Sequence, residues 1–242
     1  MKTRFFTLLY ILFAIAPVLG QNTVSYKMPL IGDKAPSFEA KSTHGDIKFP
    51  GDYYMKWKII FSHPADFTPV CTSEILELAA NQNDFKKLNT DLLVISTDNL
   101  NSHIDWIHSI ESMDYKDRGF TKINFPIIPD PSLKISKLYG MIHPNSGSLN
   151  TIRAVFIISP DNRISAIFYY PKNVGRNFEE IKRTLVALQL SDKKDVLIPA
   201  NWNPGGDVLI PSPNSMEEAE KLKKKKDPSL YSLAWYMWFL KL

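Results

Sequence analysis

Cysteine is almost absent from this 242-residue chain, which contains Cys71 alone. A single thiol excludes any disulfide within the chain, and it excludes the Cys-x-x-Cys pair of thiol–disulfide exchange proteins. The scarcity also argues against structural zinc, which is held by several Cys and His side chains at short spacings. Four histidines show no such spacing: His44, His103, His108 and His143. We therefore expect no metal site and no cofactor.

A strong excess of charge of one sign is also missing. The chain has 29 basic and 25 acidic residues, a formal net charge of +4. Two of the basic residues, Lys2 and Arg4, lie in a segment that we expect to be removed. Proteins that bind nucleic acid carry a much stronger basic stripe, so we expect no nucleic-acid partner. With 44% hydrophobic residues, the composition instead indicates a globular domain plus an appendage.

Long hydrophobic runs are limited to one at the N-terminus. Residues 5–16 are apolar apart from Thr7, follow Lys2 and Arg4, and are too short to span a bilayer comfortably. This pattern predicts a cleavable signal peptide over residues 1–20, with an uncleaved anchor as the alternative. We expect a secreted or extracytoplasmic protein with no stable membrane span after signal removal. The chain has no Asn-x-Ser/Thr sequon, which favours a bacterial compartment such as the periplasm.

Strand and helix patterns alternate through the next part of the chain. A short apolar run at 58–61, amphipathic spacing over 72–88 and a second apolar run at 92–96 predict strand, helix and strand. Such a unit implies parallel pairing of its two strands. Further along we expect a helix at 100–113, irregular chain at 124–130, a short helix at 133–139, strands at 153–158 and 164–170, and a helix at 178–190 capped by Asn177. The fold class is therefore α/β, with helices flanking a central sheet.

Composition changes after residue 190, where prolines and a Gly-Gly pair interrupt the chain. We interpret residues 191–242 as a smaller C-terminal extension. Its Ser215 and Glu218 predict a capped short helix. The apolar tail at 235–240 is expected to pack on the main domain or on a partner subunit, with membrane contact as the lesser alternative.

The segment from His63 to Cys71 lies between the first predicted strand and its helix. Pro69 has a fixed φ that suits a helix start, so Cys71 is expected in the first turn. There its sulfur would face unpaired N–H groups and the positive end of the helix dipole, which stabilise the reactive thiolate. The alternative for a lone cysteine is a small buried hydrophobe. The flanking prolines and Thr68 favour the reactive site.

Pro64, Thr68 and Cys71 match the signature Pro-x-x-x-Thr-x-x-Cys, and the chain resembles the peroxiredoxins at this point. The run 61–72 is similar in particular to the 1-Cys, peroxiredoxin-6-like subfamily. Further similar segments are 29–36, 151–156, 174–178 and 188–211. The resemblance implies a thioredoxin-like domain with a central mixed sheet over 29–190. It also implies an extension over 191–242 that mediates dimerisation, giving a homodimer or, as in some relatives, a decamer.

The resemblance also implies roles for four residues at the site. Cys71 is the nucleophile that attacks one peroxide oxygen, and Arg153 holds the thiolate and polarises the O–O bond. Thr68 hydrogen-bonds the peroxide and the thiolate, and Pro64 shields the site from water. A planar, permanently charged guanidinium suits the displacement, because negative charge moves from sulfur to oxygen.

Three further residues are expected to support the site. Glu74 and Arg176 would orient Arg153. His63 is interpreted as a supporting polar residue at the strand end rather than as the base of a Cys-His pair.

These residues predict a thiol-specific peroxidase that reduces hydrogen peroxide and alkyl hydroperoxides, with a role in antioxidant defence and redox homeostasis. Attack on peroxide converts the thiolate to a sulfenic acid. Because Cys71 is the only cysteine, an external thiol reductant must regenerate it, which is a 1-Cys mechanism. The alternative is a non-catalytic thioredoxin-fold protein that acts as a chaperone or scaffold.

Overall fold

The computed structural model describes residues 28–142 and 151–242. The predicted signal peptide at 1–20 lies outside these residues. Within them, no helix is both long and apolar enough to cross a membrane.

Five strands form the central sheet, in the order β5-β4-β3-β6-β7. Their bounds are Trp57–Ser62 (β3), Thr90–Ser96 (β4), Ile127–Pro129 (β5), Arg153–Ile158 (β6) and Ile164–Tyr170 (β7). The central strand β3 pairs parallel with β4 and antiparallel with β6. The sheet is therefore mixed, as predicted.

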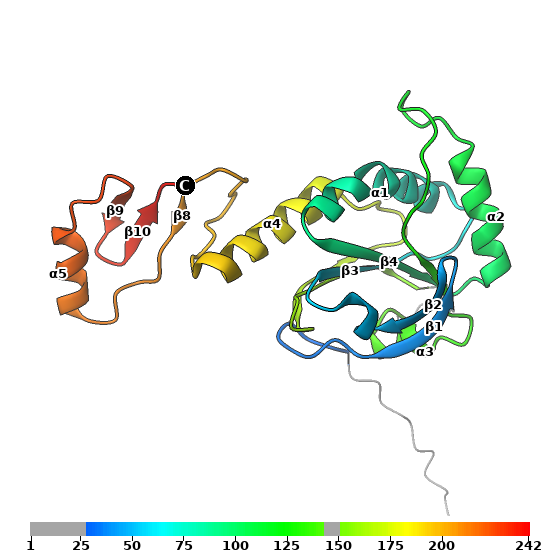
Figure 1. Ribbon diagram of the computed structural model, residues 1–242, viewed down its shortest axis with the longest axis horizontal. Helices are drawn as coiled ribbons and strands as arrows, with labels where there is room; N and C mark the ends of the chain where they lie inside the picture. The colour runs from blue at the N-terminus through cyan, green and yellow to red at the C-terminus, as the bar shows by residue number, and fades with distance from the viewer. Residues whose placement is uncertain (1–27, 143–150) are drawn as a thin grey trace, which may run out of the picture.

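Different elements cover the two faces of this sheet (Figure 1). Helices α1 (Pro69–Lys87), α2 (Leu100–Glu111) and α4 (Phe178–Lys194) pack on one face. The hairpin of β1 (Phe38–Ser42) and β2 (Gly45–Phe49) packs on the other, together with α3 (Lys134–Leu138); a short 3-10 helix, Gly51–Tyr53, follows β2. Along β3, Ile59 and Phe61 belong to the first core and Ile60 to the second. Burial on both faces explains why β3 is continuously apolar rather than alternating.

Several elements differ from the sequence predictions. Helix α1 begins at Pro69 rather than at residue 72, and α4 continues to Lys194 rather than ending at 190. The segment 124–130, predicted to be irregular, contains β5, which pairs with β4 at the sheet edge. The prolines in this segment argued against a strand, but proline is tolerated in an edge strand such as β5, which ends at Pro129. The hairpin β1–β2 was not predicted at all.

The C-terminal extension forms a small sheet of its own beyond the far end of α4 (Figure 1). Its elements are β8 (Val208–Leu209), α5 (Met216–Lys224), β9 (Leu230–Ala234) and β10 (Met237–Leu240), with strand order β8-β10-β9. The Ser215 side chain caps α5 as predicted. Leu240 packs with the end of α4, whereas Trp235 and Tyr236 are exposed at the turn between β9 and β10. Only part of the apolar tail therefore packs on the main domain.

Candidate active site

Cys71 lies in the first turn of α1, at the position that the sequence predicts. The loop 63–68 leaves the end of β3, Thr68 is the N-cap residue and Pro69 begins the helix. The Cys71 side chain is fully buried, with 0% of its surface exposed. The thiol is thus held at a helix N-terminus and away from solvent.

Arg153 brings a guanidinium to this thiol. Its Nη1 atom lies 3.3 Å from Cys71 Sγ and donates to Glu74 Oε2 at 2.6 Å. The Nε and Nη2 atoms both donate to the Lys172 carbonyl, at 3.1 and 2.8 Å. Arg153 is the first residue of β6. Because β6 runs antiparallel to β3, Arg153 lies near the C-terminal end of β3, beside the loop that leads to Cys71. The cation is therefore fixed in orientation by groups on both sides.

Arg176 reaches the same carboxylate from the segment before α4. Its backbone N and Nε donate to Glu74 Oε1 at 2.8 and 2.9 Å, and its Nη2 donates to Oε2 at 2.7 Å. Its Nη1 donates to the carbonyls of Ser62 and Ala154, which belong to β3 and β6. Glu74 thus contacts both arginines, and Arg176 is connected to Arg153 through this one carboxylate.

The carboxylate and the two guanidinium groups of this buried cluster carry a net positive charge. Burial raises the pKa of Glu74, but Arg176 and then Arg153 outweigh burial, and the net pKa lies below its ordinary value. One carboxylate therefore faces two guanidinium cations, all almost fully buried. A thiolate formed on Cys71 during the reaction would add a second negative charge beside Arg153. The arrangement can stabilise a sulfur nucleophile and then a developing oxygen anion nearby.

Two other predicted residues, Pro64 and Thr68, lie in the loop. Pro64 is buried, as expected of a residue that excludes water. The Thr68 hydroxyl donates to the Ala65 carbonyl at 3.0 Å, a contact that sequence reasoning did not foresee. A hydroxyl has one proton, so in this conformation Thr68 offers the site its lone pairs as acceptors rather than a donor.

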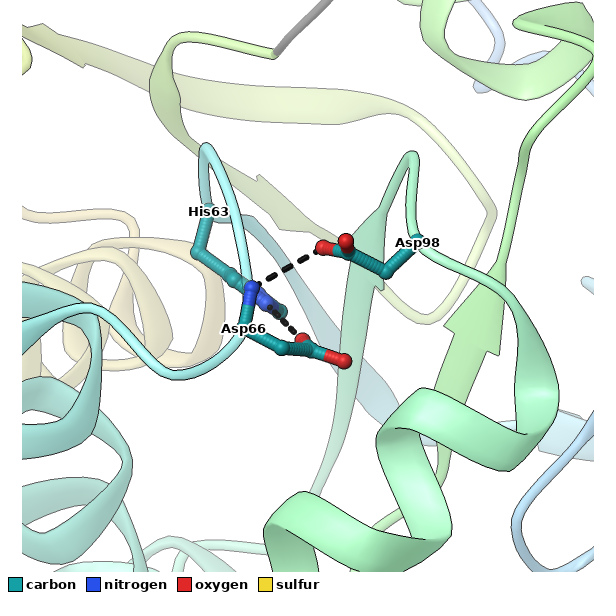
Figure 2. A group of neighbouring side chains, drawn as sticks. All are labelled: His63, Asp66 and Asp98. Carbon is teal, nitrogen blue, oxygen red and sulfur yellow. Dashed lines mark hydrogen bonds and ion pairs between the residues drawn. The ribbon is translucent and has the colours of Figure 1, made fainter.

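His63 belongs to a second buried cluster, centred on Asp66 (Figure 2). His63 Nε2 lies 2.9 Å from Asp66 Oδ1, and the Asp66 N–H donates to Asp98 Oδ2 at 2.9 Å. From α2, His103 Nδ1 and Ser102 Oγ each lie 2.8 Å from Asp66 Oδ2. The hydrogen-bond partner of the His63 ring is therefore Asp66, and its supporting role stays a prediction.

Asp66 and His63 both have a pKa below the ordinary value. Burial raises the pKa of Asp66, but the hydrogen bonds from His103 and His63 outweigh it, so the net pKa is well below the ordinary value. Burial lowers the pKa of His63 despite its bond to Asp66. The bond to Asp66 therefore does not offset the effect of burial on the pKa of His63.

Sequence reasoning did not single out Asp66, Asp98, Ser102 or His103. Asp66 was part of the matched run, but nothing in the spacing showed that the start of α2 would lie beside this loop.

The same cluster resembles a metal site only in outline. His63, Asp66 and Asp98 offer ligand atoms within 4.8 Å of one another. His63 and Asp66 already share a hydrogen bond, and Asp98 Oδ2 accepts from the Asp66 N–H and from Ser96 Oγ at 3.0 Å. A cation would have to displace these bonds, so hydrogen bonding explains the arrangement without one.

An apolar hollow of about 340 Å³ lies beside the loop, between α1 and α2. It is lined mainly by apolar side chains, among them Phe67, Trp106, Met113 and Tyr115, and Thr68 reaches its edge. The Trp106 ring also contacts the His63 ring in a tilted arrangement, with centroids 5.0 Å apart, and Trp106 Nε1 donates to Thr72 Oγ1 at 3.2 Å. The hollow therefore adjoins the second cluster, through Trp106 and His63.

Comparison with known proteins identifies the family. Residues 31–167 match the AhpC/TSA family, and residues 187–226 match the C-terminal domain of 1-Cys peroxiredoxin. A peroxiredoxin of Methanosarcina mazei is 49% identical over 211 residues, covering 87% of this chain and 96% of the relative.

Solved structures agree. A yeast mitochondrial 1-Cys peroxiredoxin aligns with a TM-score of 0.77 at 39% identity, covering 89% of this chain and all of that one. A cysteine-to-serine mutant of peroxiredoxin 6 from Arenicola marina aligns with a TM-score of 0.75 at 35% identity, covering 88% of this chain and 97% of that one. Together with the thiol held against Arg153, these matches show that the chain belongs to the peroxiredoxin family, as a 1-Cys member related to peroxiredoxin 6, and is a thiol-dependent peroxidase.

Proposed function

We propose that this peroxidase reduces hydrogen peroxide and alkyl hydroperoxides by direct attack of the Cys71 thiolate. The observation that carries the proposal is the 3.3 Å contact between Arg153 Nη1 and Cys71 Sγ at a fully buried helix start. In such a dry site a fixed cation acts on a developing charge far more strongly than in water.

The first half-reaction oxidises sulfur by two electrons. A sulfur lone pair of Cys71 attacks one peroxide oxygen, an S–O bond forms and the O–O bond breaks. The departing alkoxide or hydroxide takes a proton and leaves as alcohol or water, while Cys71 becomes a sulfenic acid. Arg153 stabilises the departing oxygen, Thr68 accepts a hydrogen bond from the peroxide, and Pro64 keeps water out.

The second half-reaction requires a molecule from outside the chain. One external thiol attacks the sulfenic sulfur, water leaves and a mixed disulfide forms on Cys71. A second thiol then releases the Cys71 thiol and a disulfide product. The yeast relative is described as resolved through glutathione and thioredoxin systems. We propose an external thiol of one of these two kinds for this chain as well.

The assembly that we propose is a homodimer, with a decamer as the larger alternative. The extension presents Leu233 with 72% and Trp235 with 65% of their surface exposed. Large apolar side chains gathered in this way are typical of a surface that another subunit covers.

Export through the signal at residues 1–20, and antioxidant work in an extracytoplasmic space, are further proposals from the sequence. N-terminal sequencing of the mature protein tests the first of them. A mature chain that begins at Met1 would contradict cleavage.

Peroxide consumption in the presence of dithiothreitol tests the proposed reaction. The wild type should consume hydrogen peroxide catalytically, and Cys71→Ser should fall to the rate of dithiothreitol alone. Equal consumption by the two proteins would favour the non-catalytic alternative. Repeating the assay with an alkyl hydroperoxide tests the substrate range.

A further inference from the structure

We propose that Ser102 and His103 are positioning residues of the peroxidase site, which act through Asp66 to hold the loop 63–68 closed over Cys71. Release of this contact admits the external thiol. The inference rests on the proposed 1-Cys cycle. The contact made by the start of α2 would favour oxidation of Cys71 by peroxide and slow its reduction by the external thiol.

Asp66 is bound to its surroundings through both carboxylate oxygens and its backbone N–H. His63, from the end of β3, occupies one carboxylate oxygen, and Ser102 and His103, from the start of α2, share the other. The Asp66 N–H is bound to Asp98, in the turn between β4 and α2 (Figure 2). One residue thus fastens the catalytic loop to the neighbouring strand–helix connection.

In the described part of the chain, the rings of His63 and His103 each make one hydrogen bond, and both bonds go to Asp66. Both rings are fully buried, and His63 Nδ1 and His103 Nε2 have no hydrogen-bond partner there. Leaving a buried nitrogen unpaired is unfavourable. Each ring therefore keeps its place for packing and for the single bond that it makes to Asp66.

The next residue of the loop, Phe67, is strained. It has a φ of +53°, a left-handed conformation that bulky residues rarely adopt, and 59% of its surface is exposed. Such strain persists only where neighbouring contacts impose it. The adjacent N-cap residue, Thr68, makes no side-chain capping bond that would secure the helix start. The side-chain bonds of Asp66 are therefore the contacts that join the middle of this loop to α2, while the backbone of His63 is held by Ile95 and Thr151.

The catalytic cycle needs the loop both closed and open. In the closed form Cys71 is fully buried against Arg153, which suits attack on a small peroxide. A thiol reductant is larger and must bring its own sulfur to the sulfenic sulfur. Oxidation also replaces the thiolate with a neutral group and weakens its attraction to Arg153. After oxidation, the hydrogen bonds from Ser102 and His103 to Asp66 therefore remain as a restraint against opening.

Rapid-mixing measurements of the separate half-reactions test this assignment. His103→Leu removes the donor, His103→Asn keeps an N–H near the place of Nδ1, and His108→Leu changes a histidine near the end of the same helix, away from Asp66. Each protein is first oxidised by hydrogen peroxide, and the sulfenic form is then reduced by dithiothreitol. Loss of one hydrogen bond to a charged group should change the loop equilibrium by about tenfold.

His103→Leu should therefore slow oxidation and accelerate reduction by dithiothreitol, while His103→Asn and His108→Leu stay near the wild type. Parallel slowing of both half-reactions, or no change in either, would overturn the proposal. If His103→Leu does not fold, Ser102→Ala provides the same comparison with one donor removed. A wild type that fails to react with peroxide would refute the proposed function itself and is a distinct outcome.

Discussion

One nitrogen of Arg153, Nη1, contacts both Cys71 Sγ, at 3.3 Å, and Glu74 Oε2, at 2.6 Å. The carboxylate therefore fixes the guanidinium in the position from which it meets sulfur. Arg176 holds the other side of Glu74 with a bidentate contact. Nucleophile, cation and counter-ion thus form a single buried unit, and changes to any member should affect the others.

Replacing Arg153 with lysine should lower kcat/KM for hydrogen peroxide by about a hundredfold. Lysine keeps the charge but loses the planar fork that contacts sulfur, Glu74 and Lys172 together. Steady-state peroxide consumption measures the effect. Arg163→Lys, on the turn after β6, is the matched control and should leave kcat/KM unchanged. Wild-type activity in Arg153→Lys would contradict the role of the guanidinium.

Replacing Glu74 with glutamine should destabilise the fold, because it removes the buried carboxylate that pairs with both Arg153 and Arg176. Removal of one partner of a buried ion pair costs roughly 3–5 kcal/mol. Urea unfolding at pH 7 measures the free energy. The control is Glu77→Gln on the same helix, whose partners Lys116 and Arg118 are exposed and whose loss should cost less than about 1 kcal/mol. An equal decrease in the free energy of unfolding for Glu74→Gln and Glu77→Gln would show that the buried ion pairs stabilise the fold no more than the exposed ones.

The pH dependence of stability should reveal the neutral His63. Burial lowers its pKa below the ordinary 6.5, so the unfolded chain binds this proton more tightly than the folded one. The free energy of unfolding should therefore fall as pH drops below 6.5, by up to ~1 kcal/mol per pH unit. The depressed pKa values of Asp66 and Glu74 act at lower pH, below their ordinary values of 3.8 and 4.5.

Comparison with His63→Gln isolates the histidine. Glutamine retains a donor near the place of Nε2 but does not titrate, so its denaturation midpoint should change less between pH 7 and 5. A wild type and variant with the same slope would show that His63 does not contribute.

The proposed dimer should depend on the exposed side chains of the extension. Leu233→Asp combined with Trp235→Asp should shift the protein towards monomer in sedimentation equilibrium at micromolar concentration. Tyr54→Asp, at an equally exposed position on the main domain, is the control. A monomeric wild type would contradict the dimer, and an unchanged double variant would exclude this surface as its interface.

Local patterns predicted the elements that build the site. The apolar runs gave β6 and β7 with their observed bounds, and Pro69 placed Cys71 in the first turn of α1. Family resemblance then selected Arg153, Glu74 and Arg176 as neighbours of the thiol. Their contacts agree with that selection.

Local sequence patterns could not predict contacts between segments that are distant in the chain. Nothing near His103 in the sequence shows that the start of α2 lies against the catalytic loop. The Thr68 hydroxyl turns to Ala65 because of the loop's conformation, which composition does not encode. The edge strand β5 was missed because its short run is interrupted by prolines, and it exists by pairing with β4.

Trapping the sulfenic acid tests the central claim most directly. The reduced protein is mixed with one equivalent of hydrogen peroxide and dimedone, without any thiol, and analysed by peptide mass spectrometry. The account predicts one equivalent of peroxide consumed per chain and a dimedone adduct on Cys71, with neither in Cys71→Ser. Peroxide consumption that persists in Cys71→Ser, or a wild type whose Cys71 stays unmodified, would contradict it.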